Sequence, residues 1–351
     1  MVCYEATDRT AFQYCGTWQA WDPDLPHVMI GSWNTSYVEL LFTGTEITLF
    51  FPKASSFTLT LDGIREPRER YAVVGSLTLS APRDGEHRLR IHNEDRTRKV
   101  WFGGAAVPDG CRIVRPAPKP HYIEFVGDSI SDSSFSFSHR VGDLLGWDFS
   151  VRARSAMALQ CDRGYWRGTV SEGFSVFPYI MGMEEAFFKT ECPDDFCGWD
   201  DIPARYRDWC EGRFDIDFDA MDDKPDIVFI FLGTNDDLFA RNVDKGYSES
   251  FVRQYRLFVE KIFRVYGADT QICILQALTN SNEGDDTTRF EAIRRAATEL
   301  MAAYPDRVRF LDSDVIAGWQ VEISPDGTHP SQKGYDRLTE ALAALLPTLY
   351  E

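Results

Sequence analysis

The chain has 351 residues, of which 44% are hydrophobic and 14% aromatic, enough to form two domains with buried cores. A net charge of −18 and a pI near 4.8 argue against nucleic acid or an anionic membrane surface as a partner, because the phosphates of either would repel the chain. No stretch approaches the roughly 18 uninterrupted apolar residues that span a bilayer. A small neutral substrate fits this composition better.

The first part of the chain is rich in short β-type runs. Runs such as EITLFFP and SFTLTLDG follow one another closely and are separated by Gly, Pro, Asp and Asn. This spacing predicts an all-β, jelly-roll-like sandwich over residues 1–114. The prolines in residues 115–120 predict a stiff, extended linker.

From residue 121 onward, apolar strands alternate with helical stretches. The predicted strands are YIEFV, DIVFIFL, TQICIL and VRFL, and the predicted helices span residues 137–145, 247–266, 287–304 and 331–346. This alternation predicts an α/β domain over residues 121–351, with a parallel sheet covered by helices on both faces.

Polar residues after two of these strands and before the last helix suggest serine-dependent catalysis. Ser129 follows YIEFVG, Asn235 follows DIVFIFLG, and Asp326 and His329 stand in the run DGTHP. The site of such a sheet lies at the carboxyl ends of its strands. There, His329 can remove the Ser129 proton while Asp326 fixes the imidazole tautomer. Asn235 can donate a hydrogen bond to a developing oxyanion.

The same residues also have structural interpretations. Ser129 is expected near the N-terminus of the following helix, where it could simply cap that helix. Asp326 could be a turn residue in Pro-Asp-Gly, and His329 could pack at a helix entry. Asp236 is expected to brace local backbone, and Asp132 to cap a helix. The presence of all the segments in one chain favours catalysis.

The blocks GDS, GTND and DGTH resemble the signature blocks of the SGNH (GDSL-type) hydrolases. The resemblance covers residues 121–351 and implies a flavodoxin-like α/β/α domain. It further implies ester hydrolysis by Ser129, His329 and Asp326, with no metal or organic cofactor.

The resemblance also implies an oxyanion hole. Its donors are the backbone N–H of Ser129, a backbone N–H from a second block, and the side chain of Asn235. The second block falls at Ala156, where the related esterases have glycine. An alanine retains the N–H, but a positive φ at this position would distort the hole.

A β-sandwich ahead of an SGNH domain is similar in architecture to the family 2 carbohydrate esterases, which remove O-acetyl groups from plant polysaccharides or small sugars. The implied function is a serine esterase for short acyl, especially O-acetyl, esters on a carbohydrate. One alternative is an esterase or thioesterase for a longer or non-sugar acyl group. Another is a catalytically impaired glycan-binding protein, for which Ala156 is the only support in the sequence. The sequence does not identify the substrate-binding residues.

Residues 159–219 form an aromatic-rich insertion in the predicted hydrolase domain. It is expected either to cover the site as a lid or wall, or to pack as a small core of its own, since both leave the same sequence trace. Its aromatic residues are Tyr165, Trp166, Phe174, Phe177, Tyr179, Phe187, Phe188, Phe196, Trp199, Tyr206 and Trp209.

The insertion carries one weak signal for a metal. Asp215, Asp217 and Asp219 resemble the first positions of an EF-hand loop. Ala220 replaces the glycine that the loop requires, so calcium is not expected.

The eight cysteines give little information about the compartment. Cys192 and Cys197 could form a disulfide, but they lack the second pair that a zinc site needs. Cys273, inside TQICIL, is expected to be an inert core thiol. Reduced thiols, together with the absence of an export signal in MVCYEATDRT, favour a cytoplasmic location, with secretion as the alternative.

Overall fold

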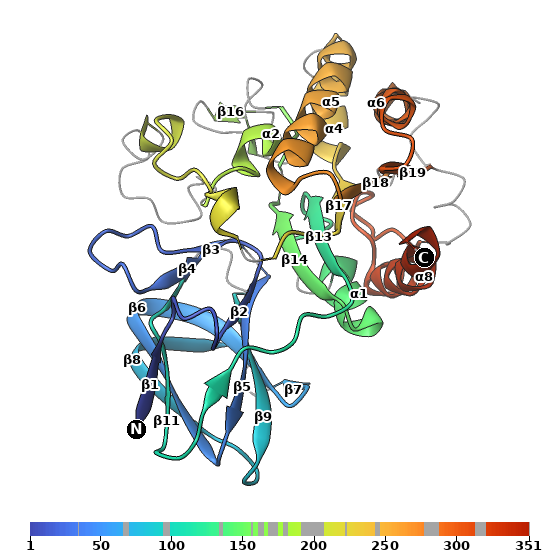
Figure 1. Ribbon diagram of the computed structural model, residues 1–351. Coiled ribbons are helices and arrows are strands. Elements are labelled where there is room, and N and C mark those ends of the chain that lie inside the picture. Colours follow the sequence, from blue (N-terminus) through green and yellow to red (C-terminus); the bar gives the residue numbers. More distant parts are fainter. Residues whose placement is uncertain are drawn as a thin grey trace. The chain divides into compact units, whose positions relative to one another are not determined.

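The computed structural model divides the chain into two compact units (Figure 1). The β-rich unit comprises Met1–Pro118 and Lys189–Asp223, and the α/β unit comprises Lys119–Phe188 and Lys224–Glu351. The residues described are 1–33, 35–65, 70–93, 99–132, 136–155, 157–160, 165–167, 175–177, 182–190, 207–221, 223–242, 246–276, 288–312 and 321–350.

The β-rich unit contains a curled antiparallel sheet and a smaller three-stranded one. The larger sheet runs in the order β1-β11-β6-β9-β5-β12, with β2 paired to β5 and both β7 and β8 paired to β6, and the smaller sheet runs β10-β4-β3. Its strands are β1 (Val2–Glu5), β2 (Gln13–Cys15), β3 (Trp18–Gln19), β4 (Met29–Gly31), β5 (Ser36–Thr43), β6 (Glu46–Leu61), β7 (Ile64–Arg65), β8 (Tyr71–Ser80), β9 (Glu86–Asn93), β10 (Val100–Phe102), β11 (Gly104–Val107) and β12 (Ile113–Val114).

The long strand β6 explains how the larger sheet curls. Its first half pairs with β8 and β11, and its second half pairs with β9. The register with β8 shifts between Phe51 and Ser55, where Pro52 has no N–H to give to the ladder. On either side of the shift, the rings of Phe51 and Phe57 stack at 4.4 Å inside a buried apolar core.

The division into units differs from the predicted domains in one segment. The boundary after Pro118 lies inside the predicted linker, but Lys189–Asp223 packs with the β-rich unit instead of the hydrolase domain. The indole of Trp33 donates to the carbonyl of Lys189 at 2.9 Å, and Arg115 pairs with Asp223 at 2.5 Å. The predicted insertion is therefore split between the two units. The composition of the insertion could not reveal this division, because the contacts that cause it join residues far apart in sequence.

The α/β unit is built on a five-stranded sheet in the order β14-β13-β17-β18-β19, and every pairing is parallel. Numbered along the chain, this order is 2-1-3-4-5, so the predicted flavodoxin-like fold is confirmed. The strands are β13 (Tyr122–Gly127), β14 (Asp148–Ala153), β17 (Ile227–Phe231), β18 (Gln271–Leu275) and β19 (Val308–Leu311), and a separate pair is formed by β15 (Tyr165–Arg167) and β16 (Ser175–Phe177).

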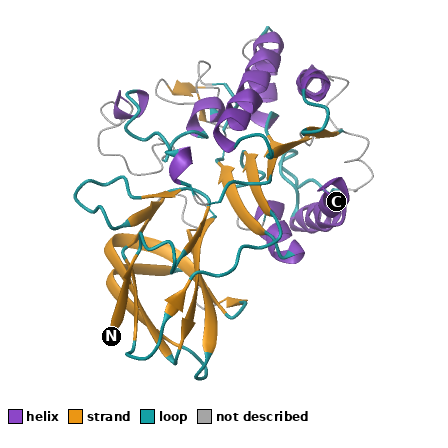
Figure 2. Ribbon diagram, viewed as in Figure 1, coloured by secondary structure: helices purple, strands orange, loops and turns teal. Residues whose placement is uncertain are grey.

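Helices cover both faces of this sheet (Figure 2). Helix α1 packs with α8, and α5 packs with α4 and α6. The helices are α1 (Phe137–Leu145), α2 (Met183–Ala186), α4 (Thr234–Asn242), α5 (Tyr247–Tyr266), α6 (Thr288–Ala303) and α8 (Gln332–Tyr350), and a 3₁₀ turn, η2 (Phe218–Ala220), lies in the β-rich unit. No helix in the described ranges has the length and apolar character needed to cross a bilayer.

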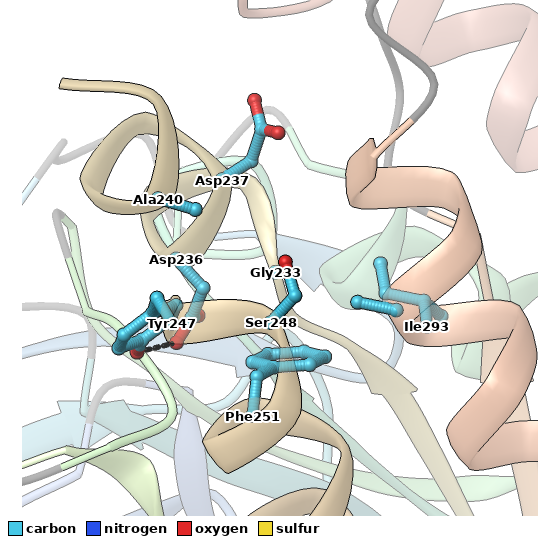
Figure 3. Close-up of a pocket in the computed structure, with 9 residues that line it drawn as sticks. Gly233, Asp236, Asp237, Ala240, Tyr247, Ser248, Phe251 and Ile293 are labelled. Atoms are coloured by element: carbon cyan, nitrogen blue, oxygen red, sulfur yellow. Dashed lines mark hydrogen bonds between the residues drawn. The ribbon is translucent and has the colours of Figure 1, made fainter. Parts of the chain in front are cut away.

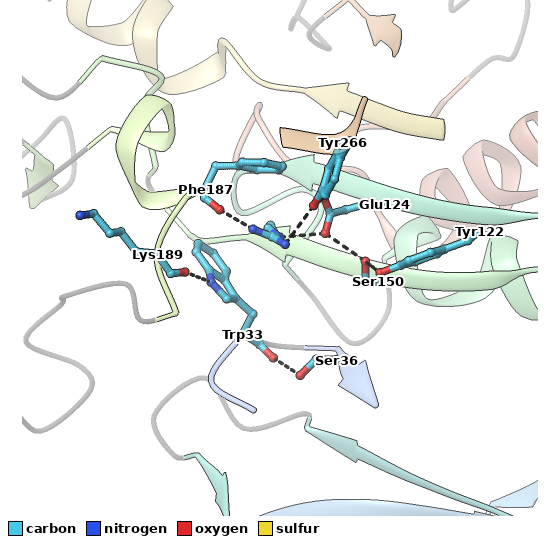
Figure 4. A network of polar contacts seen from close by, with 9 residues as sticks. Trp33, Ser36, Tyr122, Glu124, Ser150, Phe187, Lys189 and Tyr266 are labelled. Carbon is cyan, nitrogen blue, oxygen red and sulfur yellow. Dashed lines mark hydrogen bonds and ion pairs between the residues drawn. The ribbon is translucent and has the colours of Figure 1, made fainter. Parts of the chain in front are cut away.

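Strand β14 was not among the predicted strands, because polar residues interrupt its sequence DFSVRA, whereas the other strands of the sheet were recognised as nearly continuous apolar runs. Every residue of it is nevertheless buried, including Arg152. The Arg152 guanidinium donates to Glu124 of β13 at 2.8 Å and to the hydroxyl of Tyr266 at 3.0 Å. Tyr266 in turn donates to the second Glu124 oxygen at 2.6 Å (Figure 4). Arg152 also donates to the carbonyl of Phe187 and lies over its ring.

This pairing predicts a large loss of stability when only one partner is removed. We expect Arg152→Met to lower the free energy of unfolding by about 3–5 kcal/mol, because the Glu124 carboxylate would remain buried without its cation. Urea unfolding measures the loss. The matched control is Arg256→Met, since Arg256 and Glu299 form an exposed pair, for which we expect a change below about 1 kcal/mol. The double variant Arg152→Met/Glu124→Gln should recover part of the loss, and equal losses for Arg152→Met and Arg256→Met would contradict the prediction.

Candidate active site

Ser129 lies in a tight turn directly after β13. The backbone N–H groups of Ser131 and Asp132 both donate to the carbonyl of Asp128 at 3.0 Å, and the N–H of Ile130 donates to the Asp128 carboxylate at 3.0 Å. A Cβ on Gly127 would lie 2.2 Å from the Ser131 hydroxyl, so the entry to this turn requires glycine.

The sequence suggested that Ser129 lies near the N-terminus of the following helix, but this turn does not begin a helix. Helix α1 begins only at Phe137, and its N-cap is Ser136, whose side chain accepts a hydrogen bond from Ser138. The expectation that Asp132 caps a helix is therefore wrong. Its carboxylate instead accepts hydrogen bonds from the N–H and the hydroxyl of Ser155.

The structure brings Ser129, His329 and Asp326 into one hydrogen-bonded line. The Ser129 hydroxyl oxygen is 2.7 Å from Nε2 of His329, and Nδ1 of His329 is 2.7 Å from Oδ2 of Asp326. With the Nδ1 proton donated to Asp326, Nε2 is left with the lone pair that can accept the serine proton. This geometry is what a nucleophile, a general base and an orienting carboxylate require.

Asp326 also forms the turn that carries His329. Its Oδ1 accepts hydrogen bonds from the N–H groups of Thr328 and His329 and from the hydroxyl of Ser324. Partial burial opposes ionisation of Asp326, but these bonds and the imidazole outweigh it, so the pKa of Asp326 lies below its usual range. The turn and catalytic interpretations of Asp326 are therefore compatible, and its carboxylate is ionised at neutral pH.

Asn235 lies in the first turn of α4, directly after β17. Because Gly127 of β13 is aligned with Phe231 of β17, the segments carrying Ser129 and Asn235 leave the sheet side by side. The Asn235 side chain is almost fully buried, and it donates one hydrogen bond to the carbonyl of Met157 at 3.0 Å. An amide has a second N–H, which is the one available for an oxyanion. Ala156, the predicted second-block donor, lies outside the described residues.

Two buried carboxyl groups flank these residues, and their burial could not be read from the sequence. Asp128 precedes Ser129, and burial raises its pKa to about 6. Asp236 follows Asn235, and burial raises its pKa to about 7. Both belong to the GDS and GTND blocks, and of the two only Asp236 was assigned a role from the sequence, that of bracing local backbone.

A small pocket of the α/β unit lies beside Asp236 (Figure 3). It is lined by Gly233, Asp236 and Asp237 from the start of α4, by residues of α5 such as Tyr247 and Phe251, and by Ile293 of α6. Neither Ser129 nor His329 contributes to its lining. The pocket therefore lies behind the α4 turn and is not the place where the serine meets a substrate.

The predicted aromatic insertion can be assessed at the residues that are described. Phe187 is fully buried, with its ring edge-to-face against Phe258 and Tyr266 of α5, and Trp209 is buried in the β-rich unit. For these two, core packing is the correct interpretation. Phe188 is half-buried. The side chains of Tyr165, Trp166 and Phe177, and all of Phe174, Tyr179, Phe196, Trp199 and Tyr206, lie outside the described residues.

Two of the acidic residues that resemble an EF-hand loop, Asp215 and Asp217, have structural partners. Asp215 pairs with Lys189, and Asp217 accepts hydrogen bonds from the N–H groups of Asp219 and Ala220. No group of three or more His, Cys, Asp or Glu side chains in the described ranges is arranged to hold a metal ion.

Cys273 lies in β18 as expected. It is fully buried, and burial raises the pKa of its thiol to about 12, so the prediction of an inert core thiol is confirmed. Cys192 and Cys197 lie outside the described residues.

Comparison with known proteins places this arrangement in a family. Residues 197–337 match the GDSL-like Lipase/Acylhydrolase family. The match includes Asn235, Asp326 and His329, and the hydrogen bond to Nε2 of His329 joins Ser129 to them. Among curated proteins, none matches the sequence.

Several solved structures share the fold over nearly the whole chain. A family two carbohydrate esterase from Clostridium thermocellum, in complex with cellohexaose, is 20% identical with a TM-score of 0.69, covering 96% of this chain and 98% of its own. An acetyl xylan esterase from the rumen bacterium Butyrivibrio proteoclasticus is 16% identical with a TM-score of 0.68, covering 99% of both chains. A salicylyl-acyltransferase from a tetracycline biosynthetic pathway is 13% identical with a TM-score of 0.60, covering 99% of this chain and 97% of its own.

At these identities the likenesses establish the fold, and the family match adds the class of chemistry. Residues 197–337 therefore match a GDSL-like Lipase/Acylhydrolase domain, and the chain has the fold of the solved family 2 carbohydrate esterases.

Proposed function

We propose that this protein is a carbohydrate esterase that removes short acyl groups, chiefly O-acetyl, through Ser129, His329 and Asp326. The observation that carries the proposal is the hydrogen-bonded line from the serine hydroxyl through the imidazole to the carboxylate, with 2.7 Å at each step. The carbohydrate assignment is supported by the structural neighbours that are carbohydrate esterases. The acidic surface suits a neutral glycan better than an anionic one.

In the proposed first step, His329 takes the Ser129 proton on Nε2 while the hydroxyl oxygen attacks the acyl carbonyl. The carbonyl oxygen becomes an oxyanion, for which the second N–H of Asn235 and the backbone N–H groups of Ser129 and Ala156 are the proposed donors. Asp326 stabilises the imidazolium. The tetrahedral intermediate then collapses, and the sugar oxygen leaves with the proton from His329.

The second step releases the acyl group. His329 now takes a proton from water, which attacks the acyl-serine ester, and a second tetrahedral intermediate collapses to the free acid and Ser129. The ionised state of Asp326 is available across the neutral range, because its pKa is low. No described group is needed beyond the hydrogen-bonded line and the oxyanion donors.

A second candidate function is transfer of a larger acyl group to an acceptor other than water. The observation that favours it is the salicylyl-acyltransferase, which shares this fold over nearly its whole length. The esterase or thioesterase for a longer or non-sugar acyl group, derived from the sequence, is the related alternative in which water is the acceptor. A glycan-binding protein without activity is less well supported, because its only argument, Ala156, lies outside the described residues.

Acyl preference separates the two candidate activities. We expect p-nitrophenyl acetate to be hydrolysed with a higher kcat/KM than the butyrate, and the butyrate higher than the octanoate, because each methylene that an acyl pocket cannot accept costs about 1–3 kcal/mol. Ser129→Ala should reduce kcat by on the order of 10⁶-fold. Acetate release from acetylated xylo-oligosaccharides then tests the carbohydrate. A preference for octanoate, or transfer of the acyl group to an added alcohol in place of hydrolysis, would support the second candidate instead.

Asn235 provides an independent test of the proposed oxyanion hole. We expect Asn235→Ala to lower kcat by about 10²–10³-fold with little change in KM, because the bond to the oxyanion exists only in the transition state. Asn235→Asp keeps the size of the side chain but replaces its donors by acceptors, so it should lose as much. Thermal unfolding serves as the control for both variants. Full kcat in a folded Asn235→Ala protein would remove Asn235 from the proposed mechanism.

A further inference from the structure

We infer that Asp236 is a positioning residue, which together with Tyr247 holds the segment Met157–Leu159 so that the Asn235 amide is aimed at the oxyanion, while Asp132 holds the nearby Ser155. This inference rests on the proposed function and deepens it, because it assigns the residues that orient a catalytic donor. Asp236 does not touch the reacting atoms. It acts through Leu159, Met157 and then Asn235.

The first contact is between Asp236 and the backbone of Leu159. The Leu159 N–H donates to both carboxylate oxygens of Asp236, at 2.9 and 3.1 Å. The hydroxyl of Tyr247 donates to Oδ1 of Asp236 at 2.5 Å (Figure 3). All three residues are buried, so water does not compete for these bonds.

The second contact is between the neighbouring residue, Asn235, and the same segment. Its Nδ2 donates to the carbonyl of Met157, two residues before Leu159. Two consecutive side chains of α4 therefore hold one short segment, one by an N–H and the other by a carbonyl. Because one amide hydrogen is fixed on Met157, the direction of the other hydrogen is set by where Met157 lies.

Ser155, two residues before Met157, is tied to the turn that carries the nucleophile. Asp132 accepts from the N–H of Ser155 at 2.9 Å and from its hydroxyl at 3.1 Å. The N–H of Asp132 in turn donates to Asp128, directly before Ser129. Ser155 is therefore held near the nucleophile, and Met157–Leu159 is held near the oxyanion donor.

Helix α2 supports the same segment from outside. The N–H groups of Met183 and Glu184 donate to the carbonyls of Ala158 and Leu159, at 2.9 and 3.0 Å. A Cβ on Gly182 would lie 2.1 Å from the Leu159 carbonyl oxygen, so the close approach requires glycine. Residues 157–159 are thus held by hydrogen bonds from both α4 and α2.

The charge of Asp236 gives the anchor a measurable signature. Burial raises its pKa to about 7, the bonds from Tyr247 and Leu159 oppose this, and the nearby Asp128 carboxyl adds to it. Asp237 on α4 and Tyr255 on α5 are the other titratable groups of those helices near Asp236. Between about pH 4 and about pH 7 the folded state holds a proton that the unfolded state releases, so this group makes stability fall as pH rises through that window.

The test uses the full chain with p-nitrophenyl acetate. We expect Asp236→Ala and Tyr247→Phe to lower kcat by roughly 10–100-fold, with KM changed less than about threefold, because a small displacement of a donor affects the transition state more than binding. Asp236→Asn retains an acceptor for Leu159 and should recover part of the loss. Tyr247→Phe should also extend the pH-dependent loss of stability to higher pH, because the hydroxyl that favours the charged carboxyl is gone.

The matched control is Tyr255→Phe. Tyr255 lies on the same helix, is fully buried, and its hydroxyl has no hydrogen-bond partner within the described part of the chain. We expect it to leave kcat unchanged.

A double variant distinguishes positioning from general damage. If Asp236 acts through Asn235, Asp236→Ala should lower kcat far less in an Asn235→Ala background than in the unmodified protein. Full additivity of the two losses, or an unchanged kcat in folded Asp236→Ala, would overturn the inference.

A readout without catalysis separates failure of this inference from failure of the proposed function. With ¹⁵N-labelled asparagine, the side-chain NH₂ signals of Asn235 can be assigned by their absence in Asn235→Ala. We expect Tyr247→Phe, but not Tyr255→Phe, to shift these signals and to speed their exchange with water. Unchanged signals in Tyr247→Phe would overturn the positioning role even if no ester is hydrolysed, whereas shifted signals with no turnover would contradict only the proposed function.

Discussion

The parallel pairing of β13 with β17 is the constraint on which the site depends. It aligns Gly127 with Phe231, and so the nucleophile turn and the α4 turn begin at the same level of the sheet. Both turns need a glycine at their entry, since a Cβ on Gly127 would collide with Ser131 and one on Gly233 would lie 2.8 Å from Ile293. Gly233 also has a φ of 126°, which other residues rarely adopt. The glycines of the GDS and GTND blocks are therefore explained by backbone geometry, independently of any reaction.

Much of this unit could be predicted because its signals are local. Helices α1 and α5 span the predicted residues, since their apolar residues recur with helical period. Strand β14 and the short helix α4 were missed for different reasons. A buried strand that contains Asp148, Ser150 and Arg152 does not look buried until Glu124 is placed beside it. Helix α4 has four polar residues in its first turn, TNDD, which reads as a loop.

The candidate site was predicted at its motif residues and, among their supports, at Asp236, which was expected to brace local backbone and accepts hydrogen bonds from the Leu159 N–H. The motif residues can be recognised because they stand in short sequence blocks whose residue types fit one reaction. These residues are Ser129, Asn235, Asp326 and His329. The role of Asp132 was misjudged, because its partner Ser155 lies on another segment. The division of the insertion between the two units was missed for a similar reason, since Lys189 is joined to Trp33 by a hydrogen bond between residues far apart in sequence. Contacts of this kind leave neither a periodic pattern nor a motif in the sequence.

The α/β unit handles its buried carboxyl groups in two ways. Glu124 is neutralised by Arg152 and two hydroxyl groups, which favours a fixed, charged pair. Asp128 and Asp236 have instead raised pKa values, because backbone and hydroxyl donors only partly offset their burial. A buried carboxyl group with a raised pKa lowers the stability of the folded state at neutral pH. Both groups lie in the motif blocks that carry Ser129 and Asn235. Their presence is easier to explain by a positioning role than by stability.

The two halves of the proposed catalytic arrangement differ in how they are built. His329 and Asp326 are three residues apart in one turn, and that turn is closed by hydrogen bonds from Ser324, Thr328 and His329 itself. The orientation of the base is therefore local. The proposed nucleophile and oxyanion donor come from segments far apart in sequence, and their relation depends on the sheet and on the hydrogen bonds to Ser155, Met157 and Leu159. Small changes in the core should therefore displace the proposed oxyanion donor more readily than they displace His329 and Asp326.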